Sequence, residues 1–203
     1  FGGFGSQPQP QKGADVLTSA TLDLRDAVAG TTVELTADGR TMKVRIPAGV
    51  RDGQKIRLRG KGEAGLYGGP NGDLYVDLNV KRDKYFSREG DNLVTTVNIP
   101  MVAAALGTTI PLKTFDGDQE VSIPAGTQSG DTITLNGLGA TVLGTERRGD
   151  LLVRVQVTTP TDLTEEQREL LRQFAALRNE PLNEGSQVKQ RGGLFSRLKD
   201  QFK

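Results

Sequence analysis

A six-residue stretch that occurs twice decides the fold: Val44-Arg45-Ile46-Pro47-Ala48-Gly49 returns 77 residues later as Val121-Ser122-Ile123-Pro124-Ala125-Gly126. At the same offset, Gly72-Asp73-Leu74 returns as Gly149-Asp150-Leu151. The glycines and apolar residues between these anchors also recur, without an insertion or a deletion. Self-similarity at a fixed period indicates a tandem repeat, so we expect two copies of one β-rich unit of roughly seventy residues.

The first copy has the pattern of short strands separated by turns. Strands are expected at residues 14–24, 31–36, 41–46, 55–59 and 73–80. The Asp38-Gly39 turn between two of them is typical of a β-hairpin, and a glycine-rich loop occupies residues 60–72. The second copy repeats this pattern from Asn92 to Val157.

The composition favours this interpretation and excludes several classes of protein. Hydrophobic residues make up 35%, aromatic residues 5%, and there are 26 glycines, which suits short strands and turns better than a helical protein. A net charge of +1 gives no overall field for nucleic acid or an anionic membrane, so neither is expected as a partner.

The chain contains no Cys and no His. Disulfides, thiolate nucleophiles, Cys or His metal sites and imidazole acid/base catalysis are therefore excluded for these residues. The carboxylates are scattered, and no pair has a spacing suited to catalysis, so we expect neither an enzyme nor a cofactor nor a metal site. The lack of Cys, together with the lack of a long apolar stretch, favours a cytoplasmic protein.

The two ends differ from the repeats. Residues 1–12 pass from a Gly/Phe stretch into a Pro/Gln stretch and are expected to form a linker. Thr164 followed by Gln167 predicts a helix N-terminus, and four apolar residues follow at helical spacing. These are Leu170, Leu171, Phe174 and Leu177. A second amphipathic stripe lies near the end, at Leu194, Phe195, Leu198 and Phe202.

The ordered motifs resemble the C-terminal substrate-binding region of DnaJ-type (J-domain) co-chaperones. They are the Arg40–Val50 stretch, Asp52-Gly53, Arg57–Gly62, Gly69–Val76 and Phe86–Leu93 in the first copy, with Ala103–Gly107, Asp116-Gly117 and Arg148–Val153 in the second. The resemblance covers residues 13 to about 177, and Phe1–Gly5 looks like the end of that family's Gly/Phe-rich linker.

Two departures from the family pattern concern whole modules. The J domain, whose His-Pro-Asp motif stimulates a DnaK-type ATPase, is absent, so we expect these residues not to stimulate that ATPase. The chain opens on Phe1, and we expect that a segment preceded it. The Cys-x-x-Cys-x-Gly-x-Gly zinc module of many members is also missing near Asp38. Either the subtype lacks zinc or the module was deleted.

The resemblance implies a shallow apolar groove in the first copy that holds unfolded client segments. The matching positions are Val16, Leu35, Ala37, Met42 and Phe86. Met42 is physically suited to this role because its flexible thioether adapts to different guests. The alternative for each position is that it belongs only to the core of a small β domain. Lys43 and Arg45 are candidate counter-charges for the acidic C-terminal tail of the partner chaperone.

The resemblance also implies a homodimer. Leu170, Leu171, Phe174 and Leu177 are where the family places its dimer contact, and the alternative is that this helix packs on its own second copy. The stripe of the last residues would join the dimer contact or bind a partner or a membrane surface, although membrane binding is the less expected outcome. Two weak grooves in one dimer would raise avidity.

We therefore expect a mainly β protein: two tandem β-sandwich-like domains in an elongated arrangement, followed by a C-terminal amphipathic helix. The expected parts are a linker at 1–12, a substrate-groove domain at 13–85, a second domain at 86–160, and a dimerisation helix and tail at 161–203. The expected function is a stress-response chaperone that holds unfolded polypeptides for delivery to a DnaK-type partner. The rival hypothesis is a β-repeat adaptor for one folded partner or a glycan.

Overall fold

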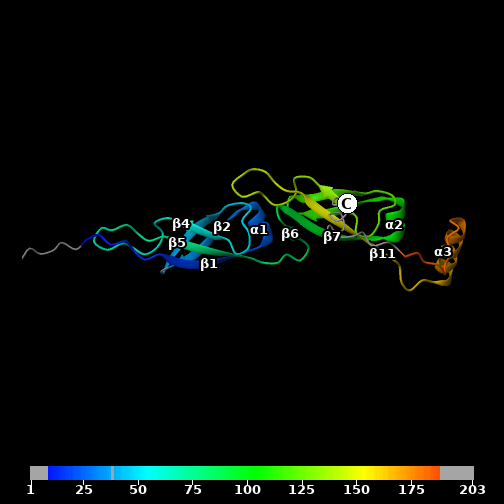
Figure 1. Cartoon of the computed structure of the whole chain (residues 1–203), viewed down its shortest axis with the longest axis horizontal. Coiled ribbons are helices and arrows are strands. Elements are labelled where there is room, and N and C mark those ends of the chain that lie inside the picture. The colour runs from blue at the N-terminus through cyan, green and yellow to red at the C-terminus, as the bar shows by residue number, and fades with distance from the viewer. Residues whose placement is uncertain (1–8, 38, 188–203) are drawn as a thin grey trace, which may run out of the picture. The chain divides into compact units, whose positions relative to one another are not determined.

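The computed structural model describes residues 9–37 and 39–187. The chain forms two compact units, Phe1–Thr159 and Pro160–Lys203 (Figure 1). Both repeats lie in the first unit and the C-terminal helix lies in the second. The predicted apolar stripe near Leu194 falls outside the described residues, as does most of the predicted linker.

The first repeat is built around a central strand. Its elements are β1 (Val16–Leu22), α1 (Leu24–Ala29), β2 (Thr31–Ala37), β3 (Arg40–Ile46), β4 (Lys55–Leu58) and β5 (Leu74–Val80). β5 pairs in parallel with β1 on one side and antiparallel with β4 on the other. Leu74, Val76 and Leu78 of β5 are fully buried at alternate positions, so one face of this sheet forms the core.

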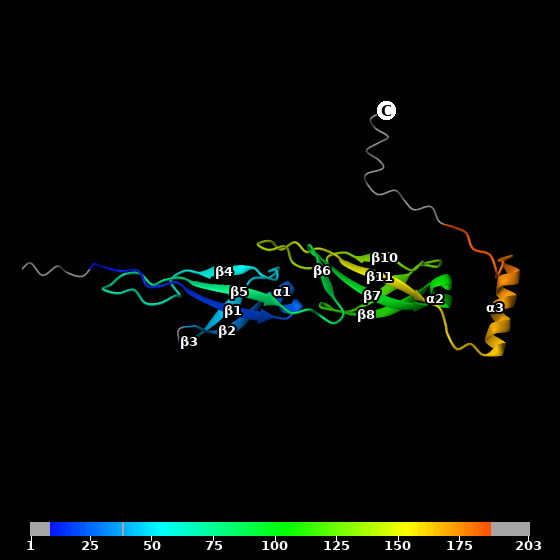
Figure 2. The ribbon, with the colours of Figure 1, turned by 60° about the horizontal axis from the view of Figure 1, so that its bottom comes forward.

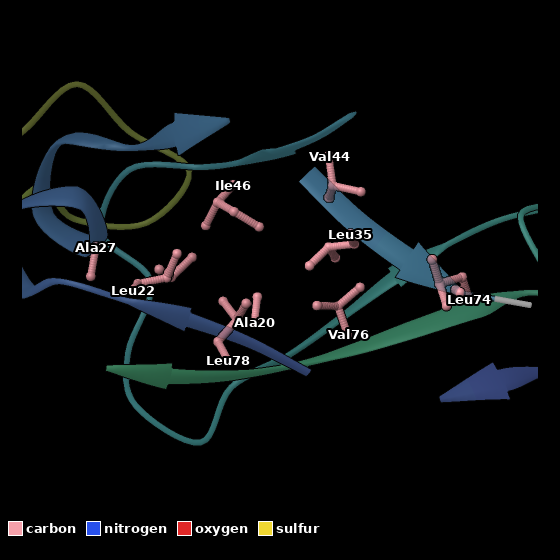
Figure 3. Close-up of a cluster of buried hydrophobic side chains, with 11 residues drawn as sticks. Ala20, Leu22, Ala27, Leu35, Val44, Ile46, Leu74, Val76 and Leu78 are labelled. Carbon is pink, nitrogen blue, oxygen red and sulfur yellow. The ribbon is translucent and has the colours of Figure 1, made fainter. Parts of the chain in front are cut away.

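The hairpin of β2 and β3 covers that face. Its register places Leu35 opposite Met42, and its inward side chains meet those of β5 (Figure 3). Leu35, Val44 and Ile46 are buried against the sheet, while the residues between them along each strand are exposed or half-buried. The predicted hairpin is confirmed, and the two layers form a small β-sandwich.

The second repeat copies the first. Its elements are β6 (Ser87–Glu89), β7 (Asn92–Pro100), α2 (Met101–Leu106), β8 (Thr108–Thr114), β9 (Gly117–Ile123), β10 (Thr132–Leu135) and β11 (Leu151–Thr158). From α2 to β11 each element begins 77 residues after its counterpart, and β7 pairs in parallel with β11 as β1 does with β5. The predicted repeat is therefore confirmed at the level of single strands.

The two repeats share a core where they join. Leu24 and Val28 of α1 are buried in a cluster with Leu93, Leu151 and Val153 of the second repeat. α1 lies beside β6 in both views (Figures 1 and 2). Burial of apolar side chains from both repeats in one cluster makes the joint a packed interface.

The sequence did not predict the short helices α1 and α2. Each has six residues, which is too short for helical periodicity to emerge from the pattern. Gly30 and Gly107 follow them with φ of 79° and 80°, a backbone conformation that glycine adopts at little cost. Residues around Leu24, expected to continue a strand, instead turn into α1.

The second unit contains helix α3 (Glu165–Leu177). The amide of Gln167 donates to the hydroxyl of Thr164 at 3.2 Å, and the amide of Thr164 donates to the side-chain carbonyl of Gln167 at 2.9 Å. This reciprocal pair is a capping box, and it confirms the predicted helix start.

Candidate functional site

The structure separates the five residues that the family pattern suggested for a groove. Leu35 and Ala37 are buried in the core of the first repeat, and Val16 and Met42 are half-buried against the same core. Phe86 belongs to the cluster at the joint, where its ring lies 4.8 Å from that of Phe115. The first four residues therefore share one region of the molecule, and Phe86 lies in another.

A hollow of about 270 Å³ opens beside two of these four residues. It lies between the tip of the β2–β3 hairpin and the turn that follows β4. Its lining combines apolar, polar and basic residues, which are Ala37, Arg40, Thr41, Met42, Gly60, Lys61, Gly62 and Asn71. Met42 is the largest apolar residue of this lining, and its side chain also packs against the core of the first repeat.

Asp73 holds one wall of the hollow in place. Its buried carboxylate accepts from the amide of Gly60 at 2.8 Å and from two nitrogens of Arg57 at 3.0 and 2.6 Å. The Gly60 amide and then the Arg57 guanidinium hold the pKa of the Asp73 carboxyl below its ordinary value. A buried charge with this many donors anchors the turn at Gly60 to the start of β5.

Backbone contacts build the rest of the wall. The amide of Gly62 donates to the carbonyl of Gly72 at 2.8 Å, and a Cβ at Gly62 would lie 2.6 Å from the Gly72 carbonyl carbon. Only glycine permits this approach. The side chain of Asn71 donates to the carbonyl of Gly60 at 3.3 Å. Hydrogen bonds therefore join the two loops that form this side of the hollow.

The hairpin beside the hollow offers backbone groups as well as a depression. In the described part of the chain, β2 and β3 hydrogen bond only to each other within their sheet. Their outer edges therefore present amides and carbonyls of the kind that an added strand would pair with. An edge with an adjacent depression that contains apolar side chains is the arrangement that binds extended peptides in many proteins.

Lys43 and Arg45 lie on the opposite face of β3 from Val44 and Ile46. The amine of Lys43 is 3.8 Å from the carboxylate of Glu34, in an exposed pair. Arg45 lines a different cavity, of about 460 Å³, together with residues 144–146 of the second repeat. The structure thus does not bring these two cations to the hollow.

The α3 stripe is largely exposed in the single chain. Leu170, Phe174 and Leu177 are 59%, 54% and 84% exposed, and Leu171 is half-buried. Val102 and Leu106 of α2 are also exposed, at 57% and 76%. Both helices therefore carry apolar side chains that are exposed in the single chain.

Sequence reasoning missed the polar lining of the hollow. Arg40, Thr41, Lys61 and Asn71 carry no signal of their own, because each is an ordinary surface residue type. They lie within the stretches that carry the family resemblance, but that resemblance did not single them out. The repeated Gly60 and Gly62, whose counterparts are Gly137 and Gly139, marked only the turn beside them. Comparing the two copies position by position would have flagged Asn71, which is replaced by Arg148.

The described residues contain neither a candidate metal cluster nor a helix that could span a membrane. Within residues 9–37 and 39–187, no three His, Cys, Asp or Glu side chains lie together in a way that would hold a metal ion. Over the same residues, no helix combines the length and the apolar character needed to cross a membrane.

Comparison with known proteins identifies relatives of the repeats. The family model described as DnaJ C terminal domain matches residues 16–160. The chain is 54% identical over 163 residues to "Chaperone protein DnaJ 2" of Streptomyces avermitilis, covering 80% of this chain and 43% of the relative.

Other relatives match to a similar extent. "Chaperone protein DnaJ 2" of Streptomyces coelicolor is 53% identical over 163 residues, covering 80% of this chain and 43% of that protein. "Chaperone protein DnaJ" of Maridesulfovibrio salexigens is 49% identical over 161 residues, covering 79% and 42%. The chain thus spans less than half the length of these curated relatives.

Proposed function

The chain belongs to the DnaJ family of chaperones, whose C-terminal domain it carries, and we propose from this premise that it binds unfolded polypeptide segments at the Met42 hollow. The observation that carries the proposal is the hollow itself, which lies next to a hairpin whose edges are available for pairing. An extended client would pair its backbone with the hairpin and place one apolar side chain beside Met42 and Ala37.

This arrangement suits a binder of many different chains. Every unfolded segment offers backbone amides and carbonyls, while a shallow depression next to a flexible thioether accepts side chains of different shape. Burial of one guest side chain stabilises the complex by about 1.5–3 kcal/mol, offset by the ordering of the guest. Affinity for a single hollow is therefore expected to be micromolar or weaker.

The test is the affinity of a labelled unfolded polypeptide, measured against its folded form, for the wild-type chain and two variants. Met42→Ser removes the apolar wall and should weaken binding roughly tenfold. Leu17→Ser, a similar change at a residue that is 63% exposed on the other sheet, should leave binding unchanged. Equal binding of folded and unfolded forms would favour the adaptor hypothesis.

A homodimer would give the weak hollow its avidity, and the proposed contact is the exposed stripe of α3. Leu170, Phe174 and Leu177 together present an apolar helix face, which in water is stabilised by burial against a second copy. Light scattering should give twice the chain mass for the wild type and the single mass for Leu170→Ser/Phe174→Ser. An unchanged mass for the double variant would remove α3 from the contact.

Delivery to a DnaK-type chaperone completes the proposed role. These 203 residues contain no His and therefore lack the His-Pro-Asp motif of the family's J domain. The chain should accordingly hold clients without raising the ATPase rate of a DnaK-type protein. Turnover of ATP by that protein, measured with and without the chain, checks this expectation.

A further inference from the structure

A second cavity lies at the joint between the two repeats, away from the Met42 hollow. Its volume is about 520 Å³, and its apolar floor comes from both repeats. Leu24, Val50 and Val80 contribute from the first repeat, and Phe86 from the segment that leads into the second. Phe86, which the family pattern suggested for the client groove, thus faces this cavity.

The rim of the cavity is rich in cations. Arg51, Lys81, Arg82 and Arg88 line it, against the two carboxylates of Asp52 and Asp83. Both carboxylates are bound to backbone amides: Asp52 accepts from Val80 at 2.7 Å, and Asp83 accepts from Tyr85 at 2.8 Å and from Phe86 at 2.9 Å. These bonds hold the chain that shapes the cavity, and the four cations of the lining still outnumber its two carboxylates.

The four cations have different roles. Arg88 is mostly buried, and its guanidinium donates to the carbonyls of Val50 at 2.7 Å, Gly49 at 3.1 Å and Gly90 at 2.8 Å. It therefore links the start of the second repeat to residues 49 and 50 of the first by hydrogen bonds. Burial, and then the positive charge of Arg51, lower the pKa of Arg88, while the nearby carboxylate of Asp91 acts in the opposite direction.

The other three cations keep donors that a ligand can use. Arg51 pairs with Asp91 at 3.0 Å through one nitrogen, and Lys81 pairs with Asp23 at 3.3 Å; both pairs are more than a third exposed. Arg82 is exposed on the rim. A guanidinium has five N–H donors in a fork that matches a carboxylate, so Arg51 and Arg82 retain capacity for an anionic group.

We propose that this joint cavity is a binding site for an acidic peptide segment that carries one apolar side chain. The apolar side chain rests against Phe86 and Val80, and flanking carboxylates bind Arg82 and Arg51. The volume is within the range of natural ligand sites, and an apolar floor with a few charged groups at the rim is their usual composition. This site goes beyond the proposed client hollow and does not depend on it.

The first test is the affinity of a labelled five-residue peptide with phenylalanine at its centre and two aspartates on each side. The matched peptides replace the aspartates by lysines or the phenylalanine by serine, and both should bind at least about fivefold more weakly. Added salt should weaken the binding of the acidic peptide, because its charges meet an exposed rim. Equal affinity for all three peptides would overturn the proposal.

Charge reversal localises the site. Arg82→Glu should weaken the acidic peptide about fivefold or more, whereas Arg147→Glu, the same change at an exposed residue outside the cavity, should have little effect. Equal weakening by both variants would show general attraction to a cation-bearing surface and overturn the proposal. Met42→Ser should leave this affinity unchanged, so failure here is distinguishable from failure of the client hollow.

The absence of cysteine makes a direct probe available. Ser87→Cys places a thiol in the lining of the cavity, and Ser122→Cys places one on the exposed outer face of β9. Saturating acidic peptide should slow alkylation of the first thiol several-fold and leave the second unchanged. If neither rate changes, or both change equally, the peptide does not bind at the joint.

Discussion

The Met42 hollow of the first repeat and the equivalent place in the second are built on the same backbone but carry different side chains. At the position of Asn71 the second repeat has Arg148, whose guanidinium binds Asp116 at 2.6 and 2.8 Å and the carbonyl of Gly139 at 3.0 and 2.8 Å. Gly139 is the counterpart of Gly62, a residue of the hollow's lining. The arginine therefore spans the place that remains open in the first copy.

The difference shows that the two repeats keep the same backbone hydrogen bonds while the side chains beside them vary. Gly62 and Gly139 make the same amide-to-carbonyl bond at 2.8 Å, and Asp73 and Asp150 accept from equivalent glycine amides at 2.8 and 2.9 Å. Side chains alone then decide whether the depression accepts a guest. The hairpin turn of the second repeat, unlike that of the first, packs at the joint through Phe115.

The largest expected effect comes from breaking the shared framework. Gly62→Ala and Gly139→Ala would each place a Cβ within 2.6 Å of backbone carbons that cannot shift without moving a strand. Each should lower the free energy of unfolding by about 3 kcal/mol. Denaturant titration followed by circular dichroism measures this loss.

The matched control is Gly53→Ala. Its Cβ would meet nothing within 4 Å, but its φ of 72° is strained for alanine, so the expected cost is about 1 kcal/mol. A cost equal to that of Gly62→Ala would show that backbone conformation, and not the close approach of the two loops, makes the glycines necessary.

A smaller loss of stability is expected when the aspartates that hold the equivalent turns of the two repeats, Asp73 and Asp150, are replaced. Asp73 is bound by Arg57, whereas the position equivalent to Arg57 in the second repeat is Thr134 and Asp150 is half-buried. Asp73→Asn should therefore destabilise the chain more than Asp150→Asn does. Thermal unfolding of both variants at neutral pH tests the order, and the reverse order would contradict the anchoring role of Asp73.

The same variant should change the dependence of stability on pH. The pKa of Asp73 is lower in the folded chain than its ordinary value of 3.8, so its charged form favours folding above about pH 4. This contribution is lost as the pH falls through the folded-state pKa. The stability difference between wild type and Asp73→Asn should consequently shrink below about pH 4, which unfolding curves at a series of pH values would reveal.

The smallest expected effect comes from closing the open hollow. Asn71→Arg places the arginine of the second repeat at the matching position of the first, and it should weaken binding of an unfolded polypeptide about threefold with little change in stability. Asn79→Arg adds the same side chain at an exposed position of β5 and serves as the control. Undiminished client binding by Asn71→Arg would show that guests do not enter the hollow.

Local patterns were sufficient to predict much of the fold. The 77-residue repeat, the Asp38-Gly39 turn and the Thr164 capping box each depend on residues close in sequence or on a copied pattern, and the structure confirms the repeat, the hairpin and the helix start. The helices α1 and α2 were not predicted, because six residues are too few for the helical spacing of apolar residues to appear. The family resemblance, confirmed by the match over residues 16–160, came from the same ordered motifs.

The location of the candidate sites was decided only in three dimensions. The hollow unites Met42 with Asn71 across two different loops, and the joint cavity unites Val50 with Phe86. The family resemblance implies a groove role for Phe86, and only the tertiary structure shows that its ring packs on Phe115 at the joint. The alternation of apolar and polar residues and the residue preferences of turns act over a few residues, so they can be recognised in the sequence. The pairing of distant segments depends instead on how whole layers pack.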